Sequence, residues 1–214
     1  MFYQEQIDST LRFGDVIKGL ALSTTNINKP ILLDTNKDDS YDLKYSVDIS
    51  MPLMVVLTPC CSIGRYDNFI ALTPLIRLKD DFFKNPYIKE DFTRINRMMQ
   101  PEQAVPPDNW MKISAEDKQK RLMEGITYAS VDLFIYEENK LFPKYLLKTE
   151  IETGYYMINF KKIQNIQFDG IRQVNIISQI KCLQLSVQTR AELRDKITFY
   201  YSRVPEEDSI LLDG

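Results

Sequence analysis

The first third of the chain has the hydrophobic pattern of a β-sheet. In 43–49 every second residue is apolar, which predicts a strand with one face toward solvent. The run LMVVLT at 53–58 is almost continuously apolar and predicts a strand that is covered on both faces. Polar turns separate these segments from further expected strands at 15–20, 30–34 and 68–75. This spacing is typical of a small barrel or an open sheet.

The pattern changes to helical spacing between residues 76 and 125. Asn85 and Pro86 are residue types favoured at the N-cap and in the first turn of a helix, and apolar residues follow at helical spacing as far as Pro101. The sequence Ser-Ala-Glu-Asp at 114–117 is typical of the start of a second, charged helix. We therefore expect a helical insertion at 76–125 within a β-rich core.

Strand-like segments resume in 126–185. Four of them are expected up to residue 168, and the sequence EENK at 137–140 predicts a hairpin turn between the first two. No internal repeat and no linker rich in Gly, Ser or Pro divides the chain. We therefore expect one domain over 1–214 with an α+β fold. Its core, at 12–75 and 126–185, is expected to be a small, partly open β-barrel or sheet.

An amphipathic helix is expected at 187–203, packed on the sheet. Thr189 and Glu192 have the pattern of a capping box, and Glu192 and Lys196 are spaced as an i,i+4 ion pair. Residues 204–214 form an acidic tail that also carries three large apolar residues. This tail either folds back on the protein, reaches into a groove of a partner, or frays.

The composition is that of a globular protein. Hydrophobic residues make up 44% and charged residues 27% of the 214 residues. There is no apolar run of about 18 residues that would predict a membrane span, and the N-terminus has acids where a signal peptide has basic and apolar regions. Three cysteines are an odd number with poor spacing for a disulfide framework. A cytoplasmic location is expected.

The absence of histidine excludes several kinds of chemistry. With 0 histidines the chain has no Ser-His or Cys-His pair and lacks nearly all of the usual zinc-site patterns. Its 7 glycines are too scattered for a phosphate-binding loop or a dinucleotide-binding motif. We therefore expect no metal and no cofactor. Any catalysis would use Asp, Glu, Lys, Arg, Tyr or Thr.

Positive charge is concentrated in the last third of the chain. Residues 140–203 carry 11 basic and 5 acidic residues, although the net charge of the chain is -3. Aromatic residues are interleaved with these bases, which is a pattern of nucleic-acid stacking surfaces and also of ordinary strand packing. The residues expected to contact RNA or a protein partner are Lys144, Lys148, Lys161, Lys162 and Arg172. A solvated surface without a partner is the alternative.

The most unusual segment is the cysteine pair that follows the apolar run. Cys60 and Cys61 come directly after Pro59, and Arg65 lies close enough in sequence to favour a reactive thiolate. Without histidine, such a thiolate lacks the usual proton carrier. The alternative is that one cysteine packs as a small apolar residue and the other lies in a turn.

Three short motifs resemble those of the MazF/PemK-like toxins. They are FGDV at 13–16, MPLMVVLTP at 51–59 and NFIALTP at 68–74, so the resemblance covers only residues 12–75. The resemblance implies a compact, partly open β-barrel. For active members of the family it also implies metal-independent cleavage of RNA with the help of an arginine and a threonine.

The match to the family's functional residues is incomplete. Thr73 stands at the position of the family's threonine, but Met51 stands where the family has an arginine before the proline. Arg12 and Arg65 remain as displaced candidates. In an active member the arginine would stabilise negative charge that develops on the phosphate oxygens. A barrel without that arginine is expected to bind rather than to cleave.

The order of elements is also similar to that of uncharacterised bacterial proteins, on the motifs CSI at 61–63 and YSR at 201–203. We expect a noncatalytic interaction subunit of a bacterial stress or antiphage-defence assembly, which binds a protein partner or further copies of itself. One alternative is a metal-independent endoribonuclease that uses Thr73 with Arg65 or Arg12. The other alternative is a thiol-reactive protein that uses Cys60 and Cys61.

Overall fold

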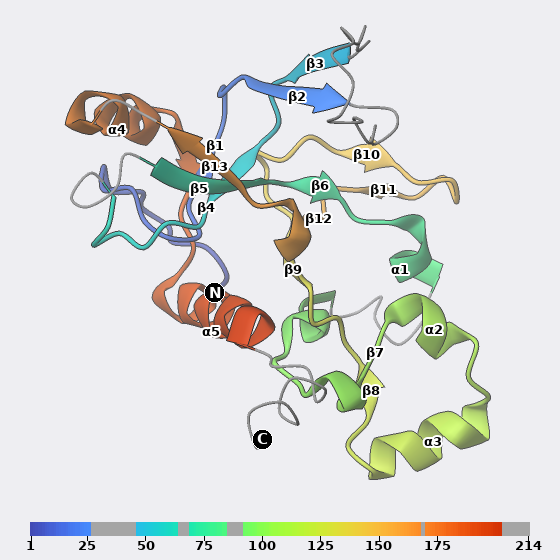
Figure 1. Cartoon of the computed structure of the whole chain (residues 1–214). Coiled ribbons are helices and arrows are strands. Elements are labelled where there is room, and N and C mark those ends of the chain that lie inside the picture. The colour runs from blue at the N-terminus through green and yellow to red at the C-terminus, as the bar shows by residue number, and fades with distance from the viewer. Residues whose placement is uncertain (27–45, 64–68, 85–91, 168–169, 203–214) are drawn as a thin grey trace, which may run out of the picture.

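Two antiparallel sheets and the helices around them form the centre of the molecule (Figure 1). The computed structural model describes residues 1–26, 46–63, 69–84, 92–167 and 170–202. The larger sheet has five strands, in the order β13 (Gln164–Gln167), β5 (Phe69–Pro74), β4 (Met54–Val56), β1 (Val16–Ile17) and β14 (Lys181–Leu183). The smaller sheet has three strands, in the order β6 (Ile76–Arg77), β12 (Tyr156–Asn159) and β9 (Leu133–Tyr136).

The chain passes from one sheet to the other at two places. β5 leads through Leu75 into β6, and β12 leads through the short 3-10 helix η3 (Phe160–Lys162) into β13. Leu75 and Phe160 are both buried at these corners, so the two sheets close over one apolar core. The α+β class and the partly open sheet core are therefore confirmed. The described strands do not form a closed barrel.

β4 is the central strand of the larger sheet, as its apolar sequence predicted. It pairs with β1 on one side and with β5 on the other. Met54 and Val56 pack into one apolar cluster, whereas Val55 packs into the main core on the opposite face. All three side chains are buried, and burial of one such side chain contributes roughly 1.5–3 kcal/mol. The strand is therefore covered on both faces.

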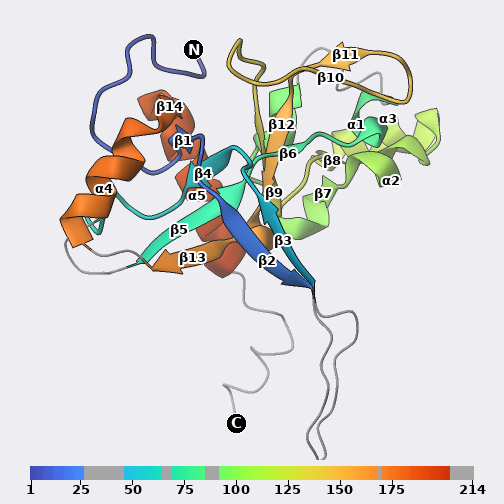
Figure 2. The same cartoon turned by 90° about the horizontal axis from the view of Figure 1, so that it is seen from above.

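A hairpin of β2 (Leu22–Asn26) and β3 (Ser46–Ser50) extends away from the two sheets (Figure 2). The alternation at 43–49 correctly predicted a strand. The prediction that the apolar side chains of this strand are buried is wrong in its described part. Val47 and Ile49 are 49% and 75% exposed, because the hairpin projects from the sheets. The strand expected at 30–34 lies outside the described residues.

The segment 76–125 is largely helical, but its helices are shorter than expected. Its elements after β6 are α1 (Asp80–Lys84), the 3-10 helices η1 (Phe92–Asn96) and η2 (Pro101–Gln103), β7 (Ala104–Val105), α2 (Pro107–Met111) and α3 (Ala115–Met123). The expected N-cap at Asn85 lies outside the described residues, and the 3-10 turn of η1 ends well before Pro101. The cap at Ser114 is confirmed, because its Oγ accepts a hydrogen bond of 3.1 Å from the backbone N–H of Asp117. β7 joins this segment to the core through parallel pairing with β8 (Thr127–Tyr128).

The second half of the β core differs from the prediction in two ways. The hairpin expected at 137–140 is wrong, since β9 pairs with β12 while β10 (Tyr145–Leu146) pairs with β11 (Glu152–Thr153). The segment expected to be entirely β also contains a helix, α4 (Gly170–Gln179), before β14. Short apolar runs fit a strand or a helix, and tertiary pairing decides between the two.

The C-terminal helix α5 (Val187–Ser202) is confirmed, but its cap and its ion pair differ from the prediction. The N-cap is Ser186, whose Oγ accepts a hydrogen bond of 3.1 Å from the backbone N–H of Thr189. The expected pair of Glu192 with Lys196 is wrong. Lys196 is 1% exposed, and its Nζ donates to the carbonyl of Ile95 in η1 at 2.6 Å. The acidic tail lies outside the described residues.

Candidate functional site

The Gly-Asp turn before β1 depends on glycine. Gly14 has a φ of +84°, and its N–H donates to the carbonyl of Val56 at 2.7 Å. A Cβ at this position would lie 2.6 Å from Cδ1 of Leu185, so any larger residue would collide with that side chain. The turn thereby places Asp15 at the start of β1.

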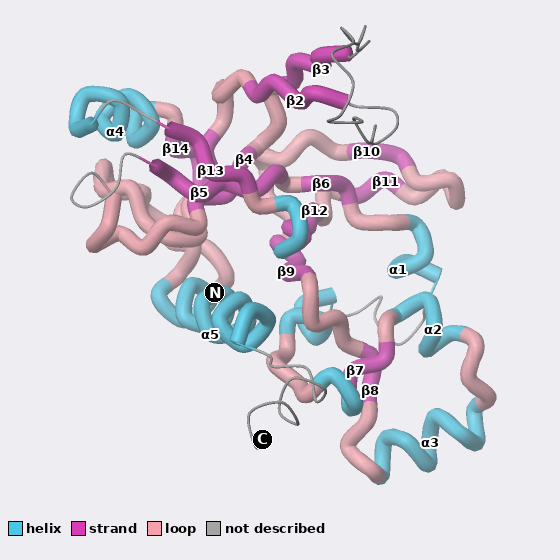
Figure 3. The backbone as a smooth tube through the Cα atoms, in the orientation of Figure 1, coloured by secondary structure: helices cyan, strands magenta, loops and turns pink. Residues whose placement is uncertain are grey.

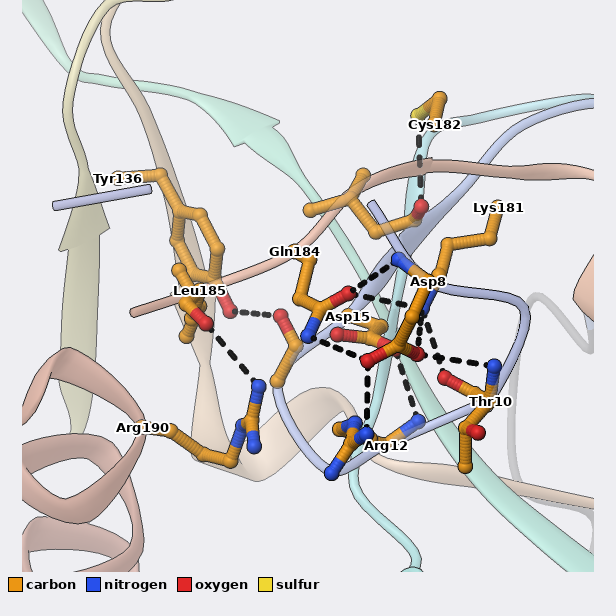
Figure 4. A network of polar contacts seen from close by, with 12 residues as sticks. Asp8, Thr10, Arg12, Asp15, Tyr136, Lys181, Cys182, Gln184, Leu185 and Arg190 are labelled. Carbon is orange, nitrogen blue, oxygen red and sulfur yellow. Dashed lines mark hydrogen bonds and ion pairs between the residues drawn. The ribbon is translucent and has the colours of Figure 1, made fainter. Parts of the chain in front are cut away.

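Asp15 lies inside a network of polar side chains (Figure 4). Its carboxylate is fully buried, and Oδ2 accepts from the backbone N–H of Arg12 at 2.8 Å and pairs with Nζ of Lys181 at 3.1 Å. The side chain of Lys181 is 1% exposed, and its Nζ also lies 3.4 Å from Oδ1 of Asp8 and donates to Oε1 of Gln184 at 3.1 Å. The network therefore joins the N-terminal segment to β1 and β14.

The electrostatics of this network follow from burial and pairing. Burial raises the pKa of Asp15, and the charge of Lys181 is the largest effect that opposes it. The hydrogen bond from Arg12 lowers the pKa of the more exposed Asp8 to about 2. Burial raises the pKa of Tyr136, and the charge of Asp15 adds to the effect. The hydroxyl of Tyr136 donates to the carbonyl of Gly14 at 3.3 Å, so it holds the turn in place.

The bonding inside the network is not complete. Three buried atoms find no hydrogen-bond partner among the described residues: Oδ1 of Asp15 and the Nε atoms of Arg12 and Arg190. Acidic and basic groups nevertheless lie next to each other, and the central carboxylate is closed to solvent. The buried groups therefore bind one another and link the turn to the strand ends rather than facing a ligand.

Of the residues predicted for RNA cleavage, the structure describes Thr73 and Arg12. Thr73 is fully buried in β5, and its hydroxyl donates to the carbonyl of Asn159 at 3.5 Å. Nη2 of Arg12 binds Oδ2 of Asp8 at 2.7 Å, and no described hydrogen bond or ion pair joins the side chains of Arg12 and Thr73. Arg65 lies outside the described residues.

The two adjacent cysteines are exposed in the turn after β4, whereas Cys182 in β14 is partly buried. The thiol of Cys182 donates to the carbonyl of Val16 at 3.3 Å, and burial raises its pKa. Cys60 also lines a groove of about 520 Å³ between this turn and α5. The exposure of the pair is compatible with a thiol-reactive role, which stays a prediction.

The walls of this groove are largely apolar, with two arginines among them. Phe13, Leu57 and Ile197 contribute apolar side chains, and Arg190 and Arg194 come from successive turns of α5. The groove has no acidic residue among its described lining residues. Arg190 donates to the carbonyl of Leu185 at 3.0 Å, which fixes part of its guanidinium. The groove is therefore suited to an apolar ligand that carries negative charge.

Arg194 also has a neighbour of opposite charge. Its Nη2 lies 2.9 Å from Oδ1 of Asp195, and both side chains are more than half exposed. An exposed pair of this kind contributes little to stability, typically about 0–1 kcal/mol. Arg194 is therefore able to exchange this partner for a carboxylate of a ligand at low cost.

The predicted basic contact residues are spread over separate elements. Lys144 pairs with Glu152 at 3.5 Å, and Lys161 pairs with Asp132 at 2.9 Å. Lys148 follows β10, Lys162 is exposed in η3, and Arg172 lies in α4, where its side chain is not described. In both views α4 lies on the other side of the molecule from the β10–β11 hairpin (Figures 1 and 2). A shared contact surface for these residues stays a prediction.

A cleft that the sequence analysis missed lies between η1, the turn after α3, and α5. It consists of two adjoining hollows of about 690 and 310 Å³ that share Arg94, Arg97, Gly125 and Thr127. The smaller hollow also contacts Trp110, the single tryptophan of the chain. Two arginines three positions apart, followed by the only tryptophan, were the signal available in the sequence.

The described part of the chain has neither a membrane-spanning helix nor a cluster of metal-binding side chains. None of its helices has the length and apolar character needed to cross a membrane. Within the same residues, no group of three or more Cys, Asp or Glu side chains is arranged to hold a metal ion.

Comparison with protein-family models, curated proteins and solved structures finds no match to this chain.

Proposed function

We propose that the chain is a noncatalytic interaction subunit that binds an acidic, apolar segment of a partner protein in the groove beside α5. The observation that carries this proposal is the chemistry of the groove. Its lining is largely apolar, Arg190 and Arg194 add positive charge, and no described lining residue is acidic. Complementary charge fixes the orientation of a bound segment, and apolar contact supplies most of its affinity.

The surface around the groove supports a protein partner. Val187 lies at the groove and is 70% exposed, so it extends the apolar walls onto the surface. Arginine next to apolar contacts is a frequent source of binding energy at protein interfaces. A carboxylate of the partner would bind Arg194, while an apolar side chain would pack against Leu57 and Ile197.

The position of Thr73 supports binding over cleavage. A nucleophile or a group that stabilises a transition state has to reach the substrate, and Thr73 is buried in β5 with its hydroxyl bound to Asn159. The resemblance of residues 12–75 to MazF/PemK-like toxins supports a role in a bacterial stress or antiphage-defence assembly. The partner would then be another component of that assembly.

Site-directed crosslinking in the cells that express the chain tests this proposal. A photoreactive amino acid replaces Val187 at the groove, and a control chain carries it at Met123, which is 80% exposed on α3. We expect one dominant protein adduct from position 187 and none of that mass from position 123. Arg194→Glu should abolish the adduct, whereas the matched control Arg121→Glu, which lies outside the groove, should retain it.

Two results would contradict the proposal. The first is an adduct that forms equally from both positions or survives Arg194→Glu, since neither depends on the groove. The second is metal-free cleavage of RNA by the purified chain that is lost in Thr73→Val. This second result would establish the endoribonuclease alternative.

A further inference from the structure

The smaller hollow of the cleft combines apolar residues, among them Leu122 and Ile126, with polar side chains that are mainly hydrogen-bond donors. Arg94 and Arg97 come from η1 and the residue after it, and Trp110 comes from α2. Guanidinium and indole groups donate hydrogen bonds and accept none. Thr127 of β8 adds a hydroxyl that can also donate. The described residues that line this hollow include no carboxylate.

The local structure holds two of these donors, Arg94 and Trp110, on a fixed frame. Nη1 of Arg94 donates to the hydroxyl of Tyr128 at 3.3 Å, and the ring of Tyr128 packs edge-on against Trp110 with 5.9 Å between ring centroids. Lys196 donates to the carbonyl of Ile95 and thereby anchors η1 to α5. These two donors therefore need little ordering when a ligand binds, which favours affinity.

Trp110 carries an unsatisfied polar group next to this hollow. The residue is 1% exposed, and its Nε1 has no hydrogen-bond partner among the described residues. A buried donor without an acceptor is costly, so an acceptor that reached it would be favoured. Because Nε1 is closed to solvent in the free protein, a ligand oxygen would reach it after a small displacement of the ring.

We propose that the smaller hollow binds a small phosphate-class oxyanion, either inorganic phosphate or a phosphate monoester. Several donors surround the space, and a phosphate group offers at least three acceptor oxygens where a carboxylate offers two. The volume of about 310 Å³ is at the lower end of the range for ligand pockets. The site takes a ligand of that size and is separate from the groove beside α5.

The neighbouring hollow favours a small ligand over a nucleic acid. Glu192 and Asp195 of α5 line the larger hollow, on the path by which a longer ligand would leave the smaller one. Their charges repel the further phosphates of a polynucleotide, while a sugar or another uncharged group is tolerated. The test therefore has to distinguish the binding of a free phosphate compound from the binding of RNA.

The only tryptophan of the chain reports directly on this site. The experiment follows Trp110 fluorescence and the melting temperature during titration with inorganic phosphate and with glycerol 3-phosphate, while chloride keeps the ionic strength constant. We expect a saturable fluorescence change and a rise in melting temperature. Arg97→Gln should weaken binding about tenfold or more, because it removes a charged donor, whereas the charge-matched control Arg121→Gln should not.

A second variant separates the ligand contact from a change in folding. Trp110→Phe keeps an aromatic ring but lacks Nε1, so we expect a folded protein whose melting temperature responds less to phosphate. If the variant does not fold, the Arg97→Gln comparison alone decides. The proposal is overturned if phosphate produces no saturable change or if Arg97→Gln and Arg121→Gln behave alike. Tighter binding of a single-stranded RNA that lacks a terminal phosphate would also overturn it.

Discussion

Two polar regions of this protein use a buried lysine in opposite ways. In the network around Asp15, Lys181 lies against two carboxylates and joins the N-terminal segment to β1 and β14. Beside the cleft, Lys196 binds the carbonyl of Ile95 and has no ion pair among the described residues, and burial lowers its pKa to about 7. The neighbouring cleft is lined by Arg94 and Arg97, which are both exposed. Lys181 is therefore bound to carboxylates inside the fold, whereas Arg97 is exposed and lines a hollow that a ligand can enter.

The largest expected effect comes from breaking the network. Lys181→Met leaves the buried carboxylate of Asp15 without its close cationic partner, and we expect a loss of about 3–5 kcal/mol in the free energy of unfolding. Urea unfolding measures this loss. The exposed Lys162→Met is the control and should change stability by less than about 0.5 kcal/mol. Adding Asp15→Leu to Lys181→Met should recover part of the loss, and failure to do so would contradict the pairing.

A pair of glycine substitutions compares the space in the two regions. Gly14 and Gly125 both have positive φ, but a Cβ at Gly14 would lie 2.6 Å from Leu185, whereas one at Gly125 has its nearest neighbour at 3.7 Å. Gly14→Ala should therefore cost about 2–4 kcal/mol, and Gly125→Ala about 1 kcal/mol from backbone strain alone. Equal losses in thermal or urea unfolding would show that the network turn is no more tightly packed than the cleft.

The buried lysine beside the cleft should make stability depend on pH. Burial lowers the pKa of Lys196 from 10.5 to about 7, with a smaller opposing effect from Asp132. The unfolded chain therefore binds more protons between these two values, and stability rises with pH in that window. We expect a gain of about 1.5 kcal/mol between pH 7 and pH 8.5. Lys196→Met should flatten this part of the profile, and an unchanged slope in the variant would assign the dependence to another group.

The smallest effect on stability is expected at the cleft surface. Arg97 is exposed and lines both hollows, so Arg97→Gln should change the free energy of unfolding by no more than about 0.5 kcal/mol. The same substitution should still weaken phosphate binding. A loss of stability as large as that of Lys181→Met would show that Arg97 supports the fold, and the contrast between the two regions would disappear.

Much of the local structure follows from the hydrophobic pattern. The apolar run at 53–58 is the central strand of the larger sheet because both faces of β4 are covered. The cap at Ser114 and the helix at 187–203 were also predictable, since side-chain capping and helical periodicity act over a few residues. The cap of α5 was placed one turn late because Ser186 and Thr189 have the same capping chemistry.

The candidate sites were less accessible to sequence reasoning. Thr73 and Arg12 were selected from a resemblance, and their burial and partners depend on strands far apart in the chain. Lys196 has the spacing of a surface ion pair with Glu192, yet it is buried because η1 packs against α5. The cleft at Arg97 forms where η1, the turn after α3, and α5 meet, and local sequence does not determine that meeting.

The sequence by itself determined the α+β class, the central strand, the C-terminal helix and the absence of histidine chemistry. These properties depend on composition and on patterns of a few residues. Tertiary structure alone decided that β9 pairs with β12, that Lys181 reaches Asp15, and that Lys196 is buried. Each of these depends on contacts between residues distant in the chain, and burial then changes the energy of the charged groups.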